Sequence, residues 1–208
     1  SHPLSIYATK KVLNILKSNS VFDVLNPDFV ERREVSLNET TLLEGKDNNS
    51  TGIEVEVFSV PGKIALFLED KNKGNNFGTD PEDTIGLKII DAKTKKYFFY
   101  IPGCADMTED LKNRVKEAPM VLFDGTLWTD DEMLKAKVGV QKTGQRMGHM
   151  SMSGEKGTIE IFKNLDIKKK IFIHINTTNP ALLEDSAERT KINEEGWEVS
   201  YDGMEVNL

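Results

Sequence analysis

Few side chains in this sequence are able to bind a metal or move a proton. The chain contains three histidines and one cysteine. Histidine changes its protonation state near neutral pH and binds metals through either ring nitrogen, and a cysteine thiolate is a soft metal ligand. His2 is terminal and is not expected to take part. Histidine-based chemistry would therefore use His149, His174 or both, and Cys104 is the one thiol.

These residues lie in short motifs that follow apolar runs. Each motif places a Gly, Cys, Asp or His after residues typical of a buried strand, which is where open α/β sheets place their sites. The motifs are FSVPG at 58–62, YIPGC at 100–104, FDGT at 123–126 and FIHIN at 172–176, with RMGHM at 146–150 in a glycine-rich stretch. Asp124 in the third motif adds a carboxylate to the set.

Each residue also has an ordinary structural interpretation, and the residues alone leave both open. His174 would be a strand-end histidine satisfied by a backbone hydrogen bond, and His149 would be a loop-packing residue. Cys104 would be a small buried hydrophobe. Asp124 would cap the turn after its strand, because burying an unpaired carboxylate is costly.

The elements that would carry these motifs change type along the chain. Strands are expected first, at 4–7, 53–60, 63–68, 85–90 and 97–101, with a helix at 8–17 and a helical turn at 21–25. Later segments alternate, with strands at 120–123, 170–175 and 197–201 and helices after Thr108, after a capping box at 129–132, at 157–163 and at 186–195. His174 would then lie within a strand. Strands followed by βα units predict a two-sheet sandwich with helices outside.

Composition limits the class of protein. The chain has 208 residues, enough for one domain over 1–208, and a net charge of −7 with scattered lysines, which argues against nucleic acid as a partner. No apolar run approaches the ~20 residues of a membrane span, so no membrane insertion is expected. A single cysteine and no visible secretory signal predict a cytoplasmic location.

The order of the motifs is similar to the C-terminal half of metallo-β-lactamase-fold hydrolases, particularly the tRNase Z-like branch. The strings VFDV, FSVPGK, YIPGCA, FDGT, TGQRMGH and IHINTTNP resemble more closely the PqqB family of pyrroloquinoline quinone (PQQ) biosynthesis. The resemblance implies an α/β (α+β) fold, a metallo-β-lactamase-like αββα sandwich. It runs from about residue 4 to the C-terminus and covers about the C-terminal two thirds of the family, with the N-terminal part missing.

The resemblance also assigns roles to individual residues. His149 and Asp124 correspond to a catalytic carboxylate–histidine dyad for proton transfer, and His174 to a terminal metal ligand. Cys104 stands where the bridging Asp of active hydrolases would be, and Gly62 where a ligand His would be. The implied cofactor is one iron or zinc ion with an incomplete ligand set in this chain.

Two functions follow from the resemblance. One is iron-dependent hydroxylation of the peptide-derived tyrosine precursor of PQQ, using O₂. The alternative is binding or transport of PQQ or its precursor towards the periplasm without catalysis. Arg146 and Lys142 are expected to bind the substrate, because PQQ carries several carboxylates, and Asn176 is the third expected substrate-binding residue. Ordinary metallo-hydrolysis is disfavoured by Gly62 and Cys104.

The missing strands would leave an exposed sheet edge, which favours pairing with another chain or with the missing N-terminal segment. The chain alone is therefore expected to be inactive, because half a ligand set does not hold a catalytic metal.

Overall fold

The computed structural model describes residues 3–70, 72, 79–138 and 142–208, so His2 lies outside the described residues. The chain divides into two compact units: residues 1–58 with 87–97, and residues 59–86 with 98–208. The expectation of a single domain stays a prediction, as does the cytoplasmic location. Within the described ranges, no helix is long and apolar enough to cross a membrane.

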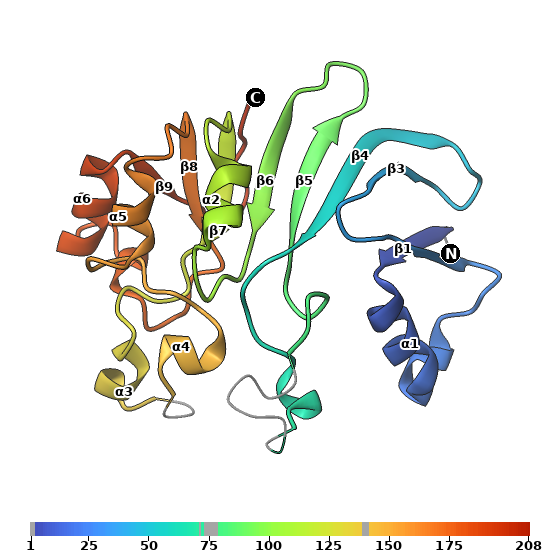
Figure 1. Cartoon of the computed structure of the whole chain (residues 1–208), viewed down its shortest axis with the longest axis horizontal. Helices are drawn as coiled ribbons and strands as arrows, with labels where there is room; N and C mark the ends of the chain where they lie inside the picture. Colours follow the sequence, from blue (N-terminus) through green and yellow to red (C-terminus); the bar gives the residue numbers. More distant parts are fainter. Residues whose placement is uncertain (1–2, 71, 73–78, 139–141) are drawn as a thin grey trace. The chain divides into compact units, whose positions relative to one another are not determined.

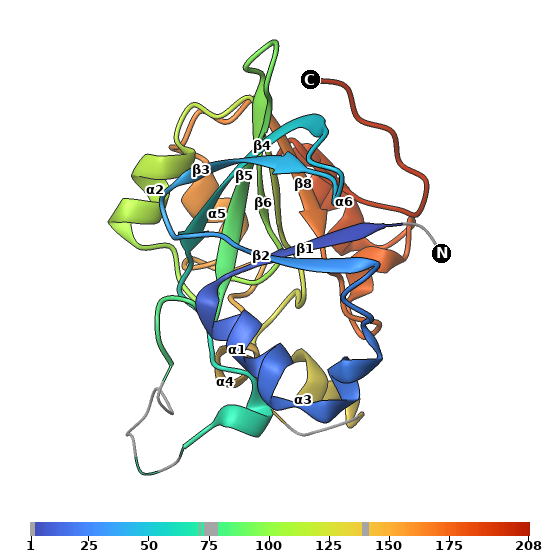
Figure 2. The same cartoon turned by 90° about the vertical axis from the view of Figure 1, so that its right-hand side faces the viewer.

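The first unit contains two pairs of strands, most of a fifth strand and one α-helix within its described residues. It contains β1 (Leu4–Ala8), α1 (Lys10–Ser18), a 3-10 turn (Ser20–Val24), β2 (Val30–Glu34), β3 (Thr40–Glu44), β4 (Ser50–Ser59) and most of β5 (Ile85–Asp91). β1 and β2 are parallel, and α1 contacts both (Figure 2). β3 and β4 are antiparallel. The early strand, the following helix and the helical turn are thus confirmed.

β2 and β3 are absent from the sequence-based prediction. β2 has the sequence VERRE, which lacks the alternation of apolar and polar residues that marks a half-buried strand. Its place depends on Arg33, whose guanidinium donates to Tyr7 Oη at 3.0 Å, Glu44 Oε2 at 3.0 Å and Asn48 Oδ1 at 2.6 Å. The charged side chain of Arg33 thus connects β2 to the neighbouring segments. The sequence of β2 contains no hydrophobic pattern that would predict a strand.

The second unit has a parallel sheet with the order β6-β7-β8-β9 (Figure 1). Its elements are β6 (Tyr97–Ile101), α2 (Glu109–Val115), β7 (Met120–Asp124), α3 (Glu132–Ala136), α4 (Gly144–Met147), α5 (Thr158–Phe162), β8 (Lys169–Ile173), α6 (Ala187–Glu194) and β9 (Trp197–Val199), with 3-10 turns at Leu66–Leu68 and Pro180–Leu182. Parallel strands end at the same edge of a sheet, so the motifs that follow β6, β7 and β8 meet there. α3 and α4 lie beyond that edge in Figure 1.

Aromatic side chains hold this sheet to its helices. Phe172 and Trp197 stack with ring centroids 3.9 Å apart and planes inclined by 10°. Phe162 of α5 contacts Trp197 at 5.1 Å and Phe123 at 4.8 Å. All four side chains are buried. This core fixes β7 and β8 side by side, and with them the residues at their carboxyl ends.

Three local predictions are wrong. Residues 63–68 form no strand, because Ile64 N donates to Thr79 Oγ1 at 3.0 Å and the segment turns at Leu66–Leu68. The capping box at 129–132 does not form: Glu132 Oε2 instead accepts from Trp128 N at 2.7 Å. The strand expected at 170–175 ends at Ile173.

We expect Phe172→Ala to lower the free energy of unfolding by about 3–5 kcal/mol, because it leaves a cavity against Trp197. Urea denaturation would measure the loss. The matched control is Leu183→Ala, where the side chain is 62% exposed and the expected change is within about 0.5 kcal/mol. Equal losses in the two variants would contradict this account of the core.

Candidate metal centre

Three predicted site residues meet at the carboxyl edge of the second unit's sheet. Asp124 is the last residue of β7 and pairs in register with Ile173, so His174 follows directly beside it. His149 comes from the turn after α4, which Gly148 closes with φ +90°. Asp124, His149 and His174 each offer one potential ligand atom within 4.8 Å of the others. The convergence of these three residues is confirmed.

The backbone turns sharply at His174. Its φ is +56°, in the left-handed region that side chains other than glycine adopt rarely. The turn is held on both sides, since Gly125 N donates to Ile173 O at 2.8 Å and Asn176 N donates to Thr126 O at 3.0 Å. His174 therefore lies outside the strand, with its side chain carried towards Asp124.

Asp124 is 0% exposed, yet its carboxylate is fully hydrogen-bonded. Oδ1 accepts from Thr126 N at 3.0 Å and from the Thr126 hydroxyl at 2.5 Å. Oδ2 accepts from Cys104 N at 2.9 Å and lies 2.7 Å from His149 Nδ1. Hydrogen bonds with two backbone amides and two side chains thus offset the unfavourable free energy of burying this charge.

These contacts shift the pKa values of the site. Burial raises the pKa of Asp124, but the hydrogen bonds with His149 and Thr126 and the nearby His174 imidazole outweigh it and hold that pKa below its usual value. Interaction with the Asp124 carboxylate, 3.9 Å from His174 Nδ1, raises the pKa of His174 against the opposing effect of burial. The carboxylate is therefore the anion around which the imidazoles are arranged.

The two imidazoles lie almost parallel, with centroids 5.3 Å apart and planes inclined by 19°. Thr126 Oγ1 lies between them, 3.0 Å from His149 Nδ1 and 2.7 Å from His174 Nδ1. The His149 side chain is 18% exposed and that of His174 54%, so one face of the pair reaches solvent. Thr126 was not singled out from the sequence, although it follows Asp124 by two residues in the FDGT motif.

The expected fourth member of the cluster is placed differently. The thiol of Cys104 is buried and donates to the Asp106 carbonyl at 3.2 Å, and Cys104 is not part of the group of close ligand atoms. Burial raises the pKa of this thiol well above its usual value; the hydrogen bond with the Asp106 carbonyl opposes this, and the charges of Asp124 and Asp106 add to it. Cys104 contacts the cluster through its backbone amide, which donates to Asp124 Oδ2 at 2.9 Å.

Two of the three predicted substrate-binding residues, Arg146 and Asn176, form hydrogen bonds within the protein. Arg146 donates to both Glu69 oxygens at 2.8 Å, a bidentate ion pair. Lys142 and Arg146 are close enough to lower the pKa of Lys63, after the larger effect of burial, while Glu69 opposes them. The structure thus groups three cations around one carboxylate. Lys63 was not identified as a site residue from the sequence, because residues 63–68 were placed in a strand.

Asn176 lies apart from that cation group. Its amide donates to Thr178 Oγ1 at 2.6 Å, and Thr178 donates to Glu132 Oε1 at 2.5 Å. This chain of hydrogen bonds fixes the segment after His174 to α3. A contact between Asn176 and a substrate stays a prediction.

Gly62 lies against Thr84 in the same unit. A Cβ atom added at Gly62 would collide with the Thr84 side chain, so a histidine would not fit there without rearrangement. Gly103 also faces the site, since a Cβ there would lie 3.6 Å from His149 Cε1. The lack of a side chain at Gly103 thus leaves space beside the His149 ring.

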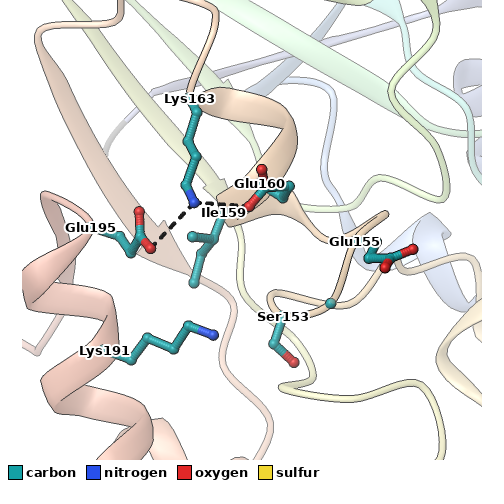
Figure 3. Close-up of a pocket in the computed structure, with 8 residues that line it drawn as sticks. Ser153, Glu155, Ile159, Glu160, Lys163, Lys191 and Glu195 are labelled. Carbon is teal, nitrogen blue, oxygen red and sulfur yellow. Dashed lines mark hydrogen bonds and ion pairs between the residues drawn. The ribbon is translucent and has the colours of Figure 1, made fainter.

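A separate cavity of about 380 Å³ lies between α5 and α6 and contains none of the predicted site residues (Figure 3). Lys163 bridges its two sides, with Nζ 2.8 Å from Glu160 Oε2 and 3.4 Å from Glu195 Oε1. Its charged residues largely balance one another, and its place apart from the histidines argues against a role in their chemistry.

The donor types of the cluster fit a transition metal. Imidazole nitrogens bind zinc and iron, and two histidines with one carboxylate is a set that non-haem iron sites use. Two or three ligands do not close a tetrahedral or octahedral shell, so further ligands must come from water, a substrate or residues beyond this cluster. The structure groups His174 with His149 and Asp124, and the implied metal ligation by Cys104 and His174 stays a prediction.

Comparison with known proteins identifies the superfamily and the fold of this chain. The family model described as "Beta-lactamase superfamily domain" matches residues 1–175. The chain therefore belongs to the β-lactamase superfamily and has the metallo-β-lactamase fold, mixed α/β with a multi-stranded sheet. Yeast PDE1 (TM-score 0.61, 15% identity, 97% of this chain and 59% of that one) shares this fold.

Within the superfamily, the sequence is similar to coenzyme PQQ synthesis protein B. The protein from Gluconacetobacter diazotrophicus is 47% identical over 98% of this chain and 65% of its own length. The crystal structure of Zn²⁺-bound PqqB from Methylobacterium extorquens aligns with TM-score 0.88 and 44% identity, over 99% of this chain and 65% of that one. This chain thus spans about two thirds of the length of these relatives.

We expect Asp124→Asn to destabilise the protein by about 1–3 kcal/mol at pH 7, because it weakens a buried, charge-assisted network. The pKa of Asp124 is lowered in the folded state, so its charge stabilises the fold above the unfolded pKa of about 3.9. That contribution disappears as pH falls through the folded value. The difference from the wild type should therefore shrink below about pH 4.

Denaturant titrations between about pH 7 and pH 3 would measure this. Asp185→Asn is the control, because Asp185 is exposed. A constant difference across this range for Asp124→Asn would exclude an ionic role for the carboxylate.

Proposed function

We propose that this chain forms the two-histidine part of the metal site in a coenzyme PQQ synthesis protein B, and that the protein acts in PQQ biosynthesis. The observation that carries the proposal is the Asp124–His149–His174 cluster at the carboxyl ends of β7 and β8. The 47% identity to the G. diazotrophicus relative supports the pathway. The finer proposal is iron-dependent hydroxylation, with O₂, of the tyrosine-derived PQQ precursor.

Bound iron would supply the O₂ chemistry that such a hydroxylation needs. His174, the more exposed of the two imidazoles, is the proposed terminal ligand. His149 is held by Asp124 through Nδ1, which leaves Nε2 to bind the metal or to exchange a proton with the substrate. Burial of Asp124 keeps the dyad in place while the ring edge stays accessible.

We assign substrate recognition to the cation group, which consists of Lys63, Lys142 and Arg146. Lys63, Lys142 and Arg146 lie around the carboxylate of Glu69, so three cations are grouped on a protein whose net charge is −7. Lys63 also lies against the His149-bearing turn, because a Cβ at Gly148 would be 3.2 Å from Lys63 Cβ. This placement suits a substrate that carries carboxylates beside the reacting ring.

The same cations would serve a carrier that binds PQQ or its precursor without chemistry. No feature of the described residues favours that alternative over the enzyme, and a carrier has no need of two imidazoles ordered around a buried carboxylate. The iron-dependent reaction is therefore the function proposed, with zinc as the other metal that the donors fit.

An exchange of segments tests the role in biosynthesis. A PQQ-producing bacterium would carry the G. diazotrophicus protein with its matching segment replaced by this chain. We expect PQQ to be formed, and His174→Ala to reduce it at least about tenfold, because loss of a ligand impairs metal binding. Lys95→Ala, which removes a surface ion pair with Glu54, is the control. Undiminished PQQ in His174→Ala would contradict a metal role for this residue.

The hybrid protein purified with Fe(II) separates enzyme from carrier. O₂ uptake that depends on the tyrosine-derived precursor supports hydroxylation, whereas tight binding of PQQ without O₂ uptake supports the carrier. Arg146→Ala and Lys142→Ala should each raise KM or Kd by about tenfold, through loss of an interaction with a substrate carboxylate. Lys191→Ala, in the cavity of Figure 3, should change neither constant.

A further inference from the structure

We infer that Thr126 is a positioning residue that sets the tautomer of His174 and links it to the Asp124–His149 pair, so that both imidazoles present Nε2 to a bound metal. Thr126 is 7% exposed, and its hydroxyl contacts all three residues. The inference refines the proposed metal site and rests on the proposed function only for the use made of that site.

The direction of each hydrogen bond follows from the number of protons available. An ionised carboxylate only accepts, and a hydroxyl donates one proton and accepts up to two. At 2.5 Å from Asp124 Oδ1, the Thr126 hydroxyl must donate its proton to the carboxylate. Its oxygen is then left as an acceptor towards both imidazoles.

His174 consequently carries its proton on Nδ1. This nitrogen lies 2.7 Å from Thr126 Oγ1, whereas Asp124 Oδ1 at 3.9 Å is too far for a hydrogen bond. Among the described residues, the hydroxyl is its one hydrogen-bonding neighbour within that limit. The Nε2 atom of His174 therefore keeps its lone pair for a ligand.

His149 has the same tautomer, but a different acceptor fixes it. Its Nδ1 lies 2.7 Å from Asp124 Oδ2 and 3.0 Å from Thr126 Oγ1, and both oxygens are acceptors. The carboxylate alone would fix this ring, so His149 does not depend on Thr126. The two histidines should thus respond differently to the loss of the hydroxyl.

Asp124 is consequently an orienting group behind the histidines. Its two oxygens already accept from Thr126 N, the Thr126 hydroxyl, Cys104 N and His149 Nδ1. A carboxylate offers about four acceptor positions, so no position is left for a metal. Of the two histidines and one carboxylate in the cluster, only the histidines are therefore available as direct metal ligands.

Nitrogen NMR of the metal-free 208-residue chain at about pH 8, where unperturbed imidazoles are neutral, tests the tautomers directly. In the wild type, both histidines should carry the proton on Nδ1. Thr126→Val keeps the shape and removes the hydroxyl, so His174 should lose its fixed tautomer while His149 retains it. Thr126→Ser should restore the wild-type pattern.

Zn²⁺ titration gives a second readout. Thr126→Val should weaken Zn²⁺ binding about 10–100-fold, as loss of a group that orients a ligand does, and Thr126→Ser should not. Thr158→Val is the matched control, because Thr158 is fully buried and its hydroxyl donates to Ser151 O away from the histidines.

A wild-type His174 protonated on Nε2 would overturn the inference, as would a Thr126→Val protein that keeps both the His174 tautomer and the Zn²⁺ affinity. If that variant does not fold, the wild-type spectrum and Thr126→Ser still decide. Failure to support PQQ formation would leave these tautomers unchanged, so the two proposals fail separately.

Discussion

A buried carboxylate with all its acceptor positions filled governs the arrangement of this site. Asp124 ends β7 in the interior of the second unit, where an isolated charge would be strongly unfavourable. Backbone amides from the β6 and β7 loops, the Thr126 hydroxyl and the His149 ring together satisfy it. Each of these groups must keep its place for the charge to remain buried, so the loops at this edge are constrained together.

This constraint explains how irregular backbone is tolerated beside the sheet. His174 adopts a left-handed conformation, which costs energy for a residue with a Cβ. Backbone hydrogen bonds on either side and the contact with Thr126 compensate for that cost. The result is an imidazole held at the surface by groups that are themselves buried, which is the arrangement a metal ligand requires.

The cation group adds a second feature to the same unit. Glu69 forms a bidentate ion pair with Arg146, and Lys63 and Lys142 lie close to the same carboxylate. Under the proposed function, a carboxylate-bearing substrate would meet these cations next to the turn that carries His149. The two features are built from different residues, since the hydrogen bonds described for the imidazole network join Asp124, Thr126, His149, His174 and the Cys104 amide.

The sequence by itself determined the class of fold, the motifs at the strand ends and the residues Asp124, His149 and His174, because buried parallel strands leave clear apolar runs that end at such motifs. It did not predict β2, whose charged residues are placed by Arg33, nor the orientation of the Cys104 thiol, nor the role of Thr126. Those depend on hydrogen-bond partners distant in sequence: Tyr7 for Arg33 and His174 for Thr126. Only the tertiary structure brings such partners together, because directional bonds between remote residues leave no periodic pattern in the chain.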